Sequence, residues 1–261
     1  MPVSQIIAVA GAPGIGKTTW IKQQIAQGNA QSPLPVVFFC PGAGTVPIDL
    51  TCMAAEFPSI QILLEGQELQ LIEQIDNGAT AFIELGFHLD LQSGAMLLDS
   101  LSEHRTLQRV AFIPSGLEVS VWHDWADEIR SAEYGFDLNG LQIWRSPLTG
   151  QVLDPASLNV FWYELTHAAY GEVCRCKGIF DMPDGRAFYI DFVEGMADSI
   201  YVPLNLPRWL EGRPERFSGI EVVGRGFDSP AIAQSLSDCC LTEQVILYYQ
   251  EHHRQSLLIS A

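Results

Sequence analysis

Short apolar runs alternate with amphipathic segments through the first half of the chain. The apolar runs have the length of strands buried on both faces, and the segments between them show helical spacing of apolar residues. Strands are predicted at residues 4–10, 34–40, 59–64, 79–85 and 108–115, and helices at residues 16–27, 66–78 and 92–104. Because strands that alternate with helices form right-handed βαβ units, we expect an α/β domain with a mainly parallel sheet and helices on both faces.

The pattern changes after about residue 133, where alternating apolar and polar positions replace the long apolar runs. A helix is predicted at residues 155–171, and the stretch D-M-P-D-G at 181–185 predicts a hairpin between two strands. Further strands are predicted at residues 199–204 and 218–226, and further helices at residues 229–239 and 242–253. The sequence therefore predicts a first domain at 1–133, a linker or hairpin at 134–154, and a smaller α+β domain with an antiparallel sheet at 155–261.

The composition is that of a folded, strongly acidic protein. Hydrophobic residues make up 48% of the 261 positions, and the formal net charge is −17. A surface of this charge repels the phosphate backbone of nucleic acids and anionic membranes, so neither is an expected partner. A small anion can still bind, because backbone N–H groups act locally against the overall field.

The sequence also favours a cytoplasmic location. Residues 1–20 lack the charged segment, apolar block and cleavage site of a secretory signal peptide, and no apolar run approaches the ~20 residues needed to span a bilayer. In the absence of export signals, cysteines are expected to be free thiols in a reducing compartment. The chain has six: Cys40, Cys52, Cys174, Cys176, Cys239 and Cys240.

A glycine-rich segment between the first strand and the first helix matches G-x-x-x-x-G-K-[ST] in full. This spacing lets backbone N–H groups wrap a β-phosphate at the positive end of a helix, while the lysine neutralises β/γ oxygens. The alternative, an ordinary strand-to-helix turn, requires a chance match to every position of the motif. The predicted nucleotide contacts are Gly11, Gly14, Gly16, Lys17, Thr18 and Thr19.

Two acidic residues are placed to complete a nucleotide site. Glu84 ends the strand at 79–85, and Asp49 lies in the loop after the strand at 34–40. Thr18 and Glu84 are the predicted ligands of a Mg²⁺ bound with GTP or ATP, and the predicted catalytic residues are Lys17, Glu84 and Asp49. For each acidic residue the alternative is a solvated loop charge. No asparagine begins an N-K-x-D motif, so the sequence does not choose between GTP and ATP.

Two blocks of sequence resemble the CobW-like GTPases (CobW/HypB/UreG-related), a family associated with metal delivery. In the first half, residues 11–19 are similar to the family's P-loop, 40–49 to its switch segment and 81–86 to its E-x-x-G block. In the second half, residues 171–180 and 219–241 resemble the CobW C-terminal domain, with matches at Arg175, Lys177, Gly178, Gly224, Arg225 and Asp228. The resemblance implies a P-loop NTPase fold, a Mg²⁺-nucleotide, slow hydrolysis in a switch, and a protein client contacted by the C-terminal domain.

The chain also departs from the family pattern. Between Asp49 and Glu84 the C-x-C-C metal motif is reduced to Cys52, and the first domain is shorter than expected by roughly a strand and a helix. Tight zinc or other transition-metal binding is therefore not expected. A nucleotide-binding regulatory module without hydrolysis, or a scaffold with a relic P-loop, remains the alternative to a switch.

Other residues with metal-binding chemistry have simpler interpretations. Cys174 and Cys176 are two apart on a predicted strand and should share one face, so with Cys239 and Cys240 they could form a four-thiolate site. Small buried apolar residues are the favoured interpretation. Cys40 and Cys52 could pair as ligands with Asp49 or Glu56, although no spacing demands it, and the adjacent histidines at 252 and 253 are expected to be a solvated helix end.

Overall fold

The computed structural model describes residues 5–31, 35–42, 44–89, 91–101, 106–132, 139–196 and 199–259. None of the helices in these ranges combines the length and the apolar character that a bilayer crossing requires. The chain divides into two compact units, Met1–Leu138 and Asn139–Ala261. Residues 134–138 of the predicted linker or hairpin lie outside the described residues, and the rest of that segment belongs to the second unit.

The first unit is built on a parallel sheet of six strands in the order β3-β2-β4-β1-β5-β6. The strands are β1 (Gln5–Gly11), β2 (Val36–Phe39), β3 (Gln61–Leu63), β4 (Thr80–Glu84), β5 (Thr106–Pro114) and β6 (Glu128–Ala132). Every residue of β1 after Gln5 is buried, as expected for a central strand covered on both faces. The core contains apolar residues from β1, β2 and β4, together with side chains of the flanking helices.

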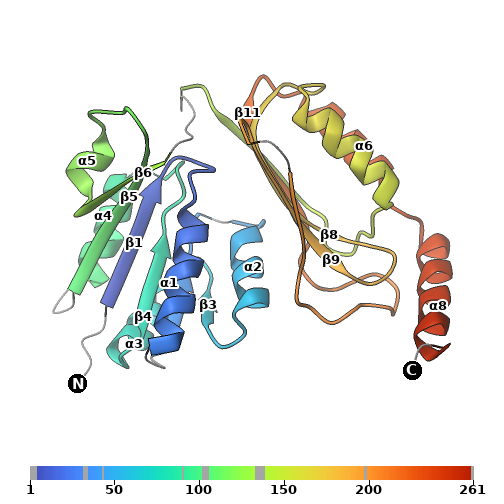
Figure 1. Ribbon diagram of the computed structural model, residues 1–261, viewed down its shortest axis with the longest axis horizontal. Helices are drawn as coiled ribbons and strands as arrows, with labels where there is room; N and C mark the ends of the chain where they lie inside the picture. Colours follow the sequence, from blue (N-terminus) through green and yellow to red (C-terminus); the bar gives the residue numbers. More distant parts are fainter. Residues whose placement is uncertain are drawn as a thin grey trace. The chain divides into compact units, whose positions relative to one another are not determined.

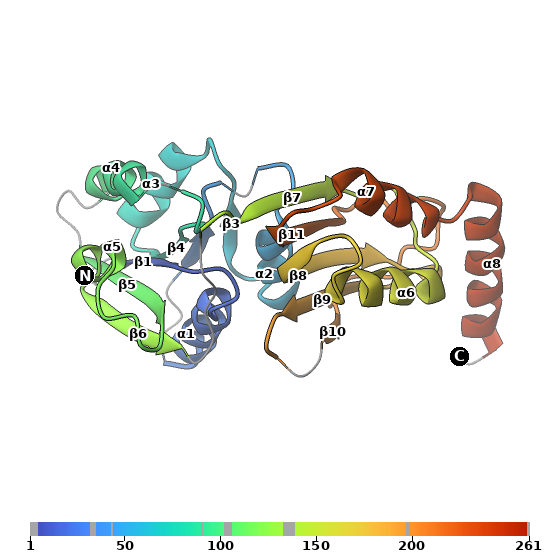
Figure 2. The ribbon, with the colours of Figure 1, turned by 90° about the horizontal axis from the view of Figure 1, so that it is seen from above.

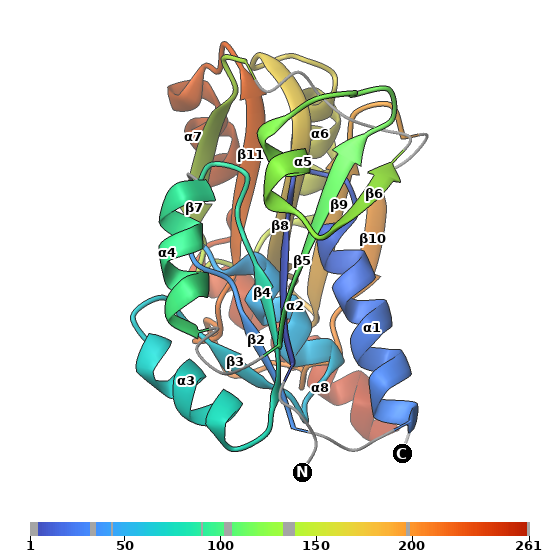
Figure 3. The same cartoon turned by 90° about the vertical axis from the view of Figure 1, so that its left-hand side faces the viewer.

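Helices cover both faces of this sheet. They are α1 (Lys17–Gln31), α2 (Ile48–Glu56), α3 (Glu68–Asp76), α4 (Leu91–Leu101) and α5 (Val121–Trp125). Helices α1 and α2 lie on one face and α3 and α4 on the other (Figure 1 and Figure 2). Figure 3 shows the same separation from another side, with α1 and α4 on opposite sides of the strands. The predicted α/β class with a mainly parallel sheet is confirmed.

The second unit is an antiparallel sheet of five strands in the order β10-β9-β8-β11-β7. Its strands are β7 (Gln142–Pro147), β8 (Glu172–Asp181), β9 (Ala187–Val193), β10 (Ile200–Pro203) and β11 (Gly219–Arg225), and its helices are α6 (Pro155–Thr166), α7 (Ser229–Asp238) and α8 (Glu243–Ile259). Apolar residues of α6 and α7 pack with those of β8, β9 and β11 in one core. The predicted α+β domain is confirmed, and β7 adds to its sheet a strand from the segment predicted as a linker.

Strand β8 carries one extra residue at Cys174. The pairs on either side of it are Arg175–Val223 and Val173–Gly224, so β11 passes the bulge without an additional residue. A bulge of this kind interrupts the alternation of faces along a strand. Val173 and Cys176 therefore both belong to the core, whereas Cys174 lies outside that cluster beside Arg225. The expectation that Cys174 and Cys176 share one face is wrong because of this bulge.

Candidate functional site

The glycine-rich segment connects the carboxyl end of β1 to the first turn of α1. Gly11, Gly14 and Gly16 adopt φ values of 140°, 70° and 93°, a region that favours glycine. A Cβ atom at Gly11 would lie 2.2 Å from the carbonyl oxygen of Phe112 on β5, so this position also needs glycine for close backbone approach. The segment therefore has the backbone of a phosphate-binding loop, with the amino-terminal end of α1 directly behind it.

Lys17 lies on this loop with its side chain buried. Only 7% of the residue is exposed, and Nζ donates hydrogen bonds to the carbonyl oxygens of Gly11 at 3.1 Å and Ala12 at 2.8 Å. These carbonyls hold the ammonium group over the loop. The arrangement places a positive charge where the motif requires one for β/γ-phosphate oxygens.

Thr18 and Glu84 meet although they lie 66 positions apart. The Thr18 hydroxyl lies 3.0 Å and 2.8 Å from the two carboxylate oxygens of Glu84 and donates its one proton to this carboxylate. Glu84 is the last residue of β4 and pairs in register with Val9 of β1. β1 and β4 are neighbours in the sheet, but the chain leaves them in opposite directions: from β1 it leads to β2, and from β4 it leads to β5. The carboxyl edge of this pair of strands is therefore a topological switch point of the sheet. Ligands of α/β proteins bind in the crevice at such points.

The donor set at this point fits Mg²⁺. A hydroxyl and a carboxylate are hard oxygen ligands, which Mg²⁺ prefers, and it commonly binds through one or two protein groups together with substrate phosphates. The Glu84 residue is only 6% exposed, so its charge lies in a buried position beside the loop. Of the other predicted contacts, Thr19 is exposed on α1, and its role remains a prediction.

Asp49 lies in the first turn of α2, a helix that begins after the loop following β2. Because β2 is the neighbour of β4, this loop leaves the same edge of the sheet as Glu84 and the glycine-rich segment. Asp49 is half-buried. Its catalytic role remains a prediction.

His88 is a residue of this edge that the sequence did not indicate. A Cβ atom at Gly42 would lie 2.9 Å from His88 Nε2, and one at Gly86 would lie 2.7 Å from His88 Cε1. The two glycines therefore leave room for the ring, which lies between the loop after β2 and the loop after β4. The segments at 40–49 and 81–86, predicted as switch and acidic blocks, are in contact through this histidine.

In the second unit, the charged residues of the predicted motif form ion pairs across the sheet. Lys177 and Arg145 flank Glu221, with nitrogen–oxygen distances of 3.2 Å and 2.7 Å. Burial alone would raise the pKa of Glu221, but the two cations outweigh it and lower that pKa to about 2. On the other side of β8, Arg175 pairs with Asp191 at 3.2 Å.

The remaining motif residues shape the backbone of this unit. A Cβ atom at Gly224 would lie 1.9 Å from the carbonyl oxygen of Glu172, and one at Gly178 would lie 2.4 Å from Phe180 Cζ. Asp228 caps α7 by accepting a hydrogen bond from the backbone N–H of Ala231 at 3.0 Å. The sixth position, Arg225, donates to the Glu172 carboxylate at 2.9 Å, so all six matching positions have structural roles in the sheet and its following helix.

A comparison with protein families finds a match over the segment that contains these residues. Residues 149–240 match the family described as the cobalamin synthesis protein cobW C-terminal domain. The second unit contains a CobW C-terminal domain. This match confirms the resemblance to the CobW-like family that the motifs predicted. A search of curated proteins found no significant match.

Two crystal structures show a looser likeness. The Zn(II)-bound YjiA GTPase from E. coli is 10% identical to this chain, with a TM-score of 0.33 over 92% of this chain and 99% of that protein. A Zn(II)-bound triple mutant of the YjiA GTPase is 11% identical, with the same coverage and TM-score. A likeness this loose carries no argument about the ligands or activity of the present chain.

The cysteines of the CobW C-terminal domain do not gather into the four-thiolate site considered from the sequence. Cys176 and Cys239 are buried in the apolar core, while Cys174 lies outside it. Among the described residues, one group of three metal-ligating side chains has its ligand atoms within 4.8 Å of one another: Glu172, Cys174 and Glu194. Arg225 already binds this group, donating to Glu172 at 2.9 Å and lying 3.6 Å from the Cys174 sulfur. Burial, with Glu194 nearby, raises the pKa of Cys174 to about 11.

We predict that the reduced protein binds Zn²⁺ only weakly, with a dissociation constant above about 1 μM. Tetrahedral zinc sites need three or four protein ligands, and the segment between Asp49 and Glu84 supplies one thiol. Titration against a chromophoric chelator measures the affinity. Stoichiometric binding tighter than micromolar that disappears in a Cys40→Ser/Cys52→Ser variant would contradict the prediction and favour a metal-delivery role.

Proposed function

We propose that the chain binds a Mg²⁺-nucleoside triphosphate at the carboxyl edge of the first sheet and hydrolyses it slowly. The observation that carries the proposal is the hydrogen bond from the Thr18 hydroxyl to the Glu84 carboxylate, beside a complete phosphate-binding loop. This contact brings together a hydroxyl from the first turn of α1 and a carboxylate from the end of β4, at the place where nucleotide-binding α/β folds hold their ligand.

Each residue of this edge has a role that follows from its chemistry. The backbone N–H groups of the loop bind phosphate oxygens, and Lys17 neutralises their charge from its place above the loop. A Mg²⁺ held by Thr18 and Glu84 would offset the negative charge on the β- and γ-phosphate oxygens. Glu84, and Asp49 on α2, would orient the attacking water.

The contact made by His88 supports a switch. In this proposal, a change near the γ-phosphate that moves the loop after β4 also displaces Gly42, because the His88 ring fills the space between that loop and Gly42. In this proposal the segment at 40–49 transmits the nucleotide state, and the CobW C-terminal domain contacts a protein client. Exposed apolar side chains on edge strand β10, Ile200 and Val202, favour a protein contact at this domain.

Glu84→Gln tests the proposed hydrolysis. We expect phosphate release to slow by at least about tenfold, because the variant removes the carboxylate charge at the metal and water positions. Thr18→Ala should weaken nucleotide binding in the presence of Mg²⁺ and leave binding in EDTA nearly unchanged. Phosphate release is followed with a coupled assay, and affinity with a fluorescent nucleotide.

Glu73→Gln is the matched control, since Glu73 is exposed on α3. Unchanged phosphate release in Glu84→Gln would contradict the assigned role of this carboxylate. If the unmodified protein binds nucleotide and releases no phosphate, the chain is instead a nucleotide-binding regulatory module.

A second experiment concerns the choice of base. Guanine specificity rests on an aspartate that accepts hydrogen bonds from the base, and the N-K-x-D motif that supplies it is missing. We therefore predict a difference between GTP and ATP affinity of less than about tenfold, or roughly 1.4 kcal/mol. Competition titrations with both nucleotides measure it. A much larger preference would point to another segment, such as residues 136–140, of which 136–138 lie outside the described residues.

A further inference from the structure

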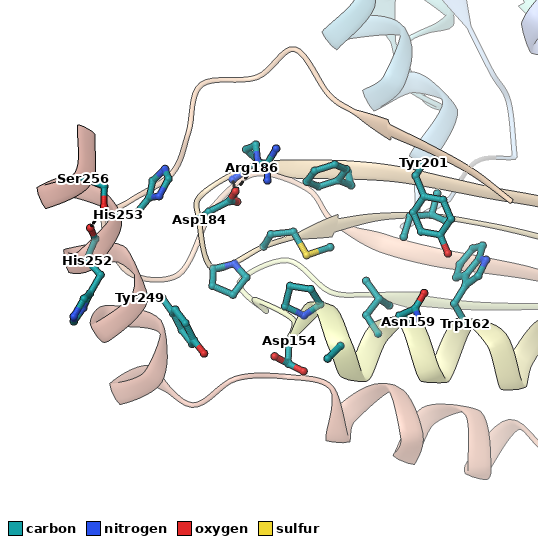
Figure 4. Close-up of a pocket in the computed structure, with 17 residues that line it drawn as sticks. Asp154, Asn159, Trp162, Asp184, Arg186, Tyr201, Tyr249, His252, His253 and Ser256 are labelled. Carbon is teal, nitrogen blue, oxygen red and sulfur yellow. Dashed lines mark hydrogen bonds and ion pairs between the residues drawn. The ribbon is translucent and has the colours of Figure 1, made fainter. Parts of the chain in front are cut away.

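The second unit contains a pocket that the nucleotide site does not use. It lies between the start of α6, the turn that joins β8 to β9, strands β9 and β10, and α8 (Figure 4). Its volume is about 700 Å³, within the range of pockets that bind small molecules.

The floor of the pocket is apolar and held in place by the core. Its apolar side chains include Leu158, Trp162, Met182, Phe188 and Ile190. Trp162 is fully packed, with an edge-to-face contact to Phe180 and a hydrogen bond of 2.9 Å from Nε1 to the Ser199 hydroxyl. A floor fixed in this way offers a preformed surface to an apolar ligand.

A second hollow of about 520 Å³ adjoins the pocket. Three residues line both: Asn159, Trp162 and Tyr201. In Figure 4 these three lie together at one end of the pocket, while Tyr249, His252 and His253 of α8 lie at the other. The pocket is therefore elongated, and the apolar side chains lie between its two ends.

Helix α8 forms one wall and is fixed by a buried glutamine. Gln250 is 1% exposed, accepts a hydrogen bond from Gly212 N at 2.8 Å, and donates to the carbonyl oxygens of Gly212 and Trp209. These bonds hold the helix so that Tyr249, His252 and His253 border the pocket. His252 is exposed, as the sequence predicted for these residues, and the half-buried His253 lies beside it on the pocket wall.

An exposed arginine lies beside the α8 end of the pocket and contacts two of the residues that line it. Arg208 contacts His253 Nε2 and donates to the carbonyl oxygen of Asp184 at 3.3 Å. Among the residues that the structure describes, no carboxylate forms an ion pair with Arg208, although the chain has 31 acidic and 14 basic residues. Arg186, by contrast, pairs with Asp184 at 2.5 Å. An arginine in this setting favours a bound anion, because guanidinium groups match carboxylate and phosphate geometry.

We propose that this pocket binds an amphipathic small molecule with an elongated apolar body and one anionic head. The body lies on the floor formed by Trp162, Phe188 and Ile190, and the head binds Arg208 and His253 at the α8 end. The proposal is independent of the nucleotide site, since every residue it uses belongs to the second unit.

Isothermal titration of the full chain with dodecanoate and dodecanol tests the proposal. The two probes share the apolar body and differ in the head, so we expect dodecanoate to bind at least about tenfold more tightly. Dodecyl phosphate, in a third titration, shows whether the head site prefers phosphate or carboxylate. All probes are kept below their micelle concentrations.

Three variants locate the binding. Arg208→Gln should remove the advantage of dodecanoate over dodecanol, whereas Arg254→Gln, whose side chain pairs with Glu251 on the exposed side of α8, should keep it. Ala156→Trp fills the pocket from an exposed position and should weaken both probes. Circular dichroism confirms that each variant is folded.

Three results would overturn the proposal. Equal affinity for dodecanoate and dodecanol would exclude an anion site at Arg208, and no detectable binding of either would exclude an amphiphile site. A dimer in light scattering that Ala156→Trp dissociates would show that a second copy of the chain fills the pocket.

Discussion

Lys17→Ala is expected to lower the affinity for a nucleoside triphosphate by about 100-fold, or roughly 2.7 kcal/mol. The variant removes the ammonium group that the carbonyls of Gly11 and Ala12 hold over the loop. The effect is large because this group is buried, and charge-assisted hydrogen bonds are stronger than neutral ones. Isothermal titration with a non-hydrolysable triphosphate and Mg²⁺ measures the change.

Lys22→Ala is the matched control for this experiment. Lys22 is on the same helix and pairs with Glu56 at 2.6 Å, at a partly exposed position. We expect its affinity for the triphosphate to stay within about twofold of the unmodified protein. An affinity of the Lys17 variant within the same limit would show that the loop does not bind phosphate.

Gly224→Ala is expected to destabilise the second unit by on the order of 3 kcal/mol or more. The added Cβ would lie 1.9 Å from the carbonyl oxygen of Glu172, which belongs to the paired strand. Backbone atoms cannot rotate away as a flexible side chain can, so β8 and β11 must separate. Urea denaturation gives the free energy of unfolding, and hydrogen exchange in the two strands locates the loss.

Gly226→Ala separates the steric effect from backbone strain. At Gly226 the φ angle is +62°, and an added Cβ would have no neighbour within 4 Å. We therefore expect a cost of only about 1 kcal/mol, that of an alanine in the left-handed region. Equal losses in the two variants would show that the contact with Glu172 does not determine the stability of this pair of strands.

The sequence predicted the central strands and most helices because their patterns are local and strong. It did not predict α2, whose nine residues follow a loop rich in glycine and proline and give a short helical pattern. It also did not predict β6, an edge strand in which Arg130 and Glu128 form an ion pair and no clear alternation of burial appears. Short edge elements depend on tertiary contacts, which a window of sequence does not contain.

In the candidate site, too, some residues follow from a local sequence pattern and others depend on tertiary contacts. The loop residues follow one motif, so their positions could be predicted, and Glu84 could be placed because it ends a buried strand. The contact of His88 with Gly42 joins loops that are 46 positions apart, and it depends on how both loops fold. The pocket beside α8 depends on four separate segments, and its two histidines gave no local signal beyond their adjacency.

The extra residue in β8 also determines how this strand tolerates deletions. A deletion elsewhere in Glu172–Asp181 would exchange core and solvent positions on one side of the cut, because neighbouring residues of a strand point to opposite faces. Deletion of Cys174 would join Val173 directly to Arg175, and the alternation would continue unbroken to Cys176. The strand can therefore change its length by one residue at this position while its apolar side chains stay in the core.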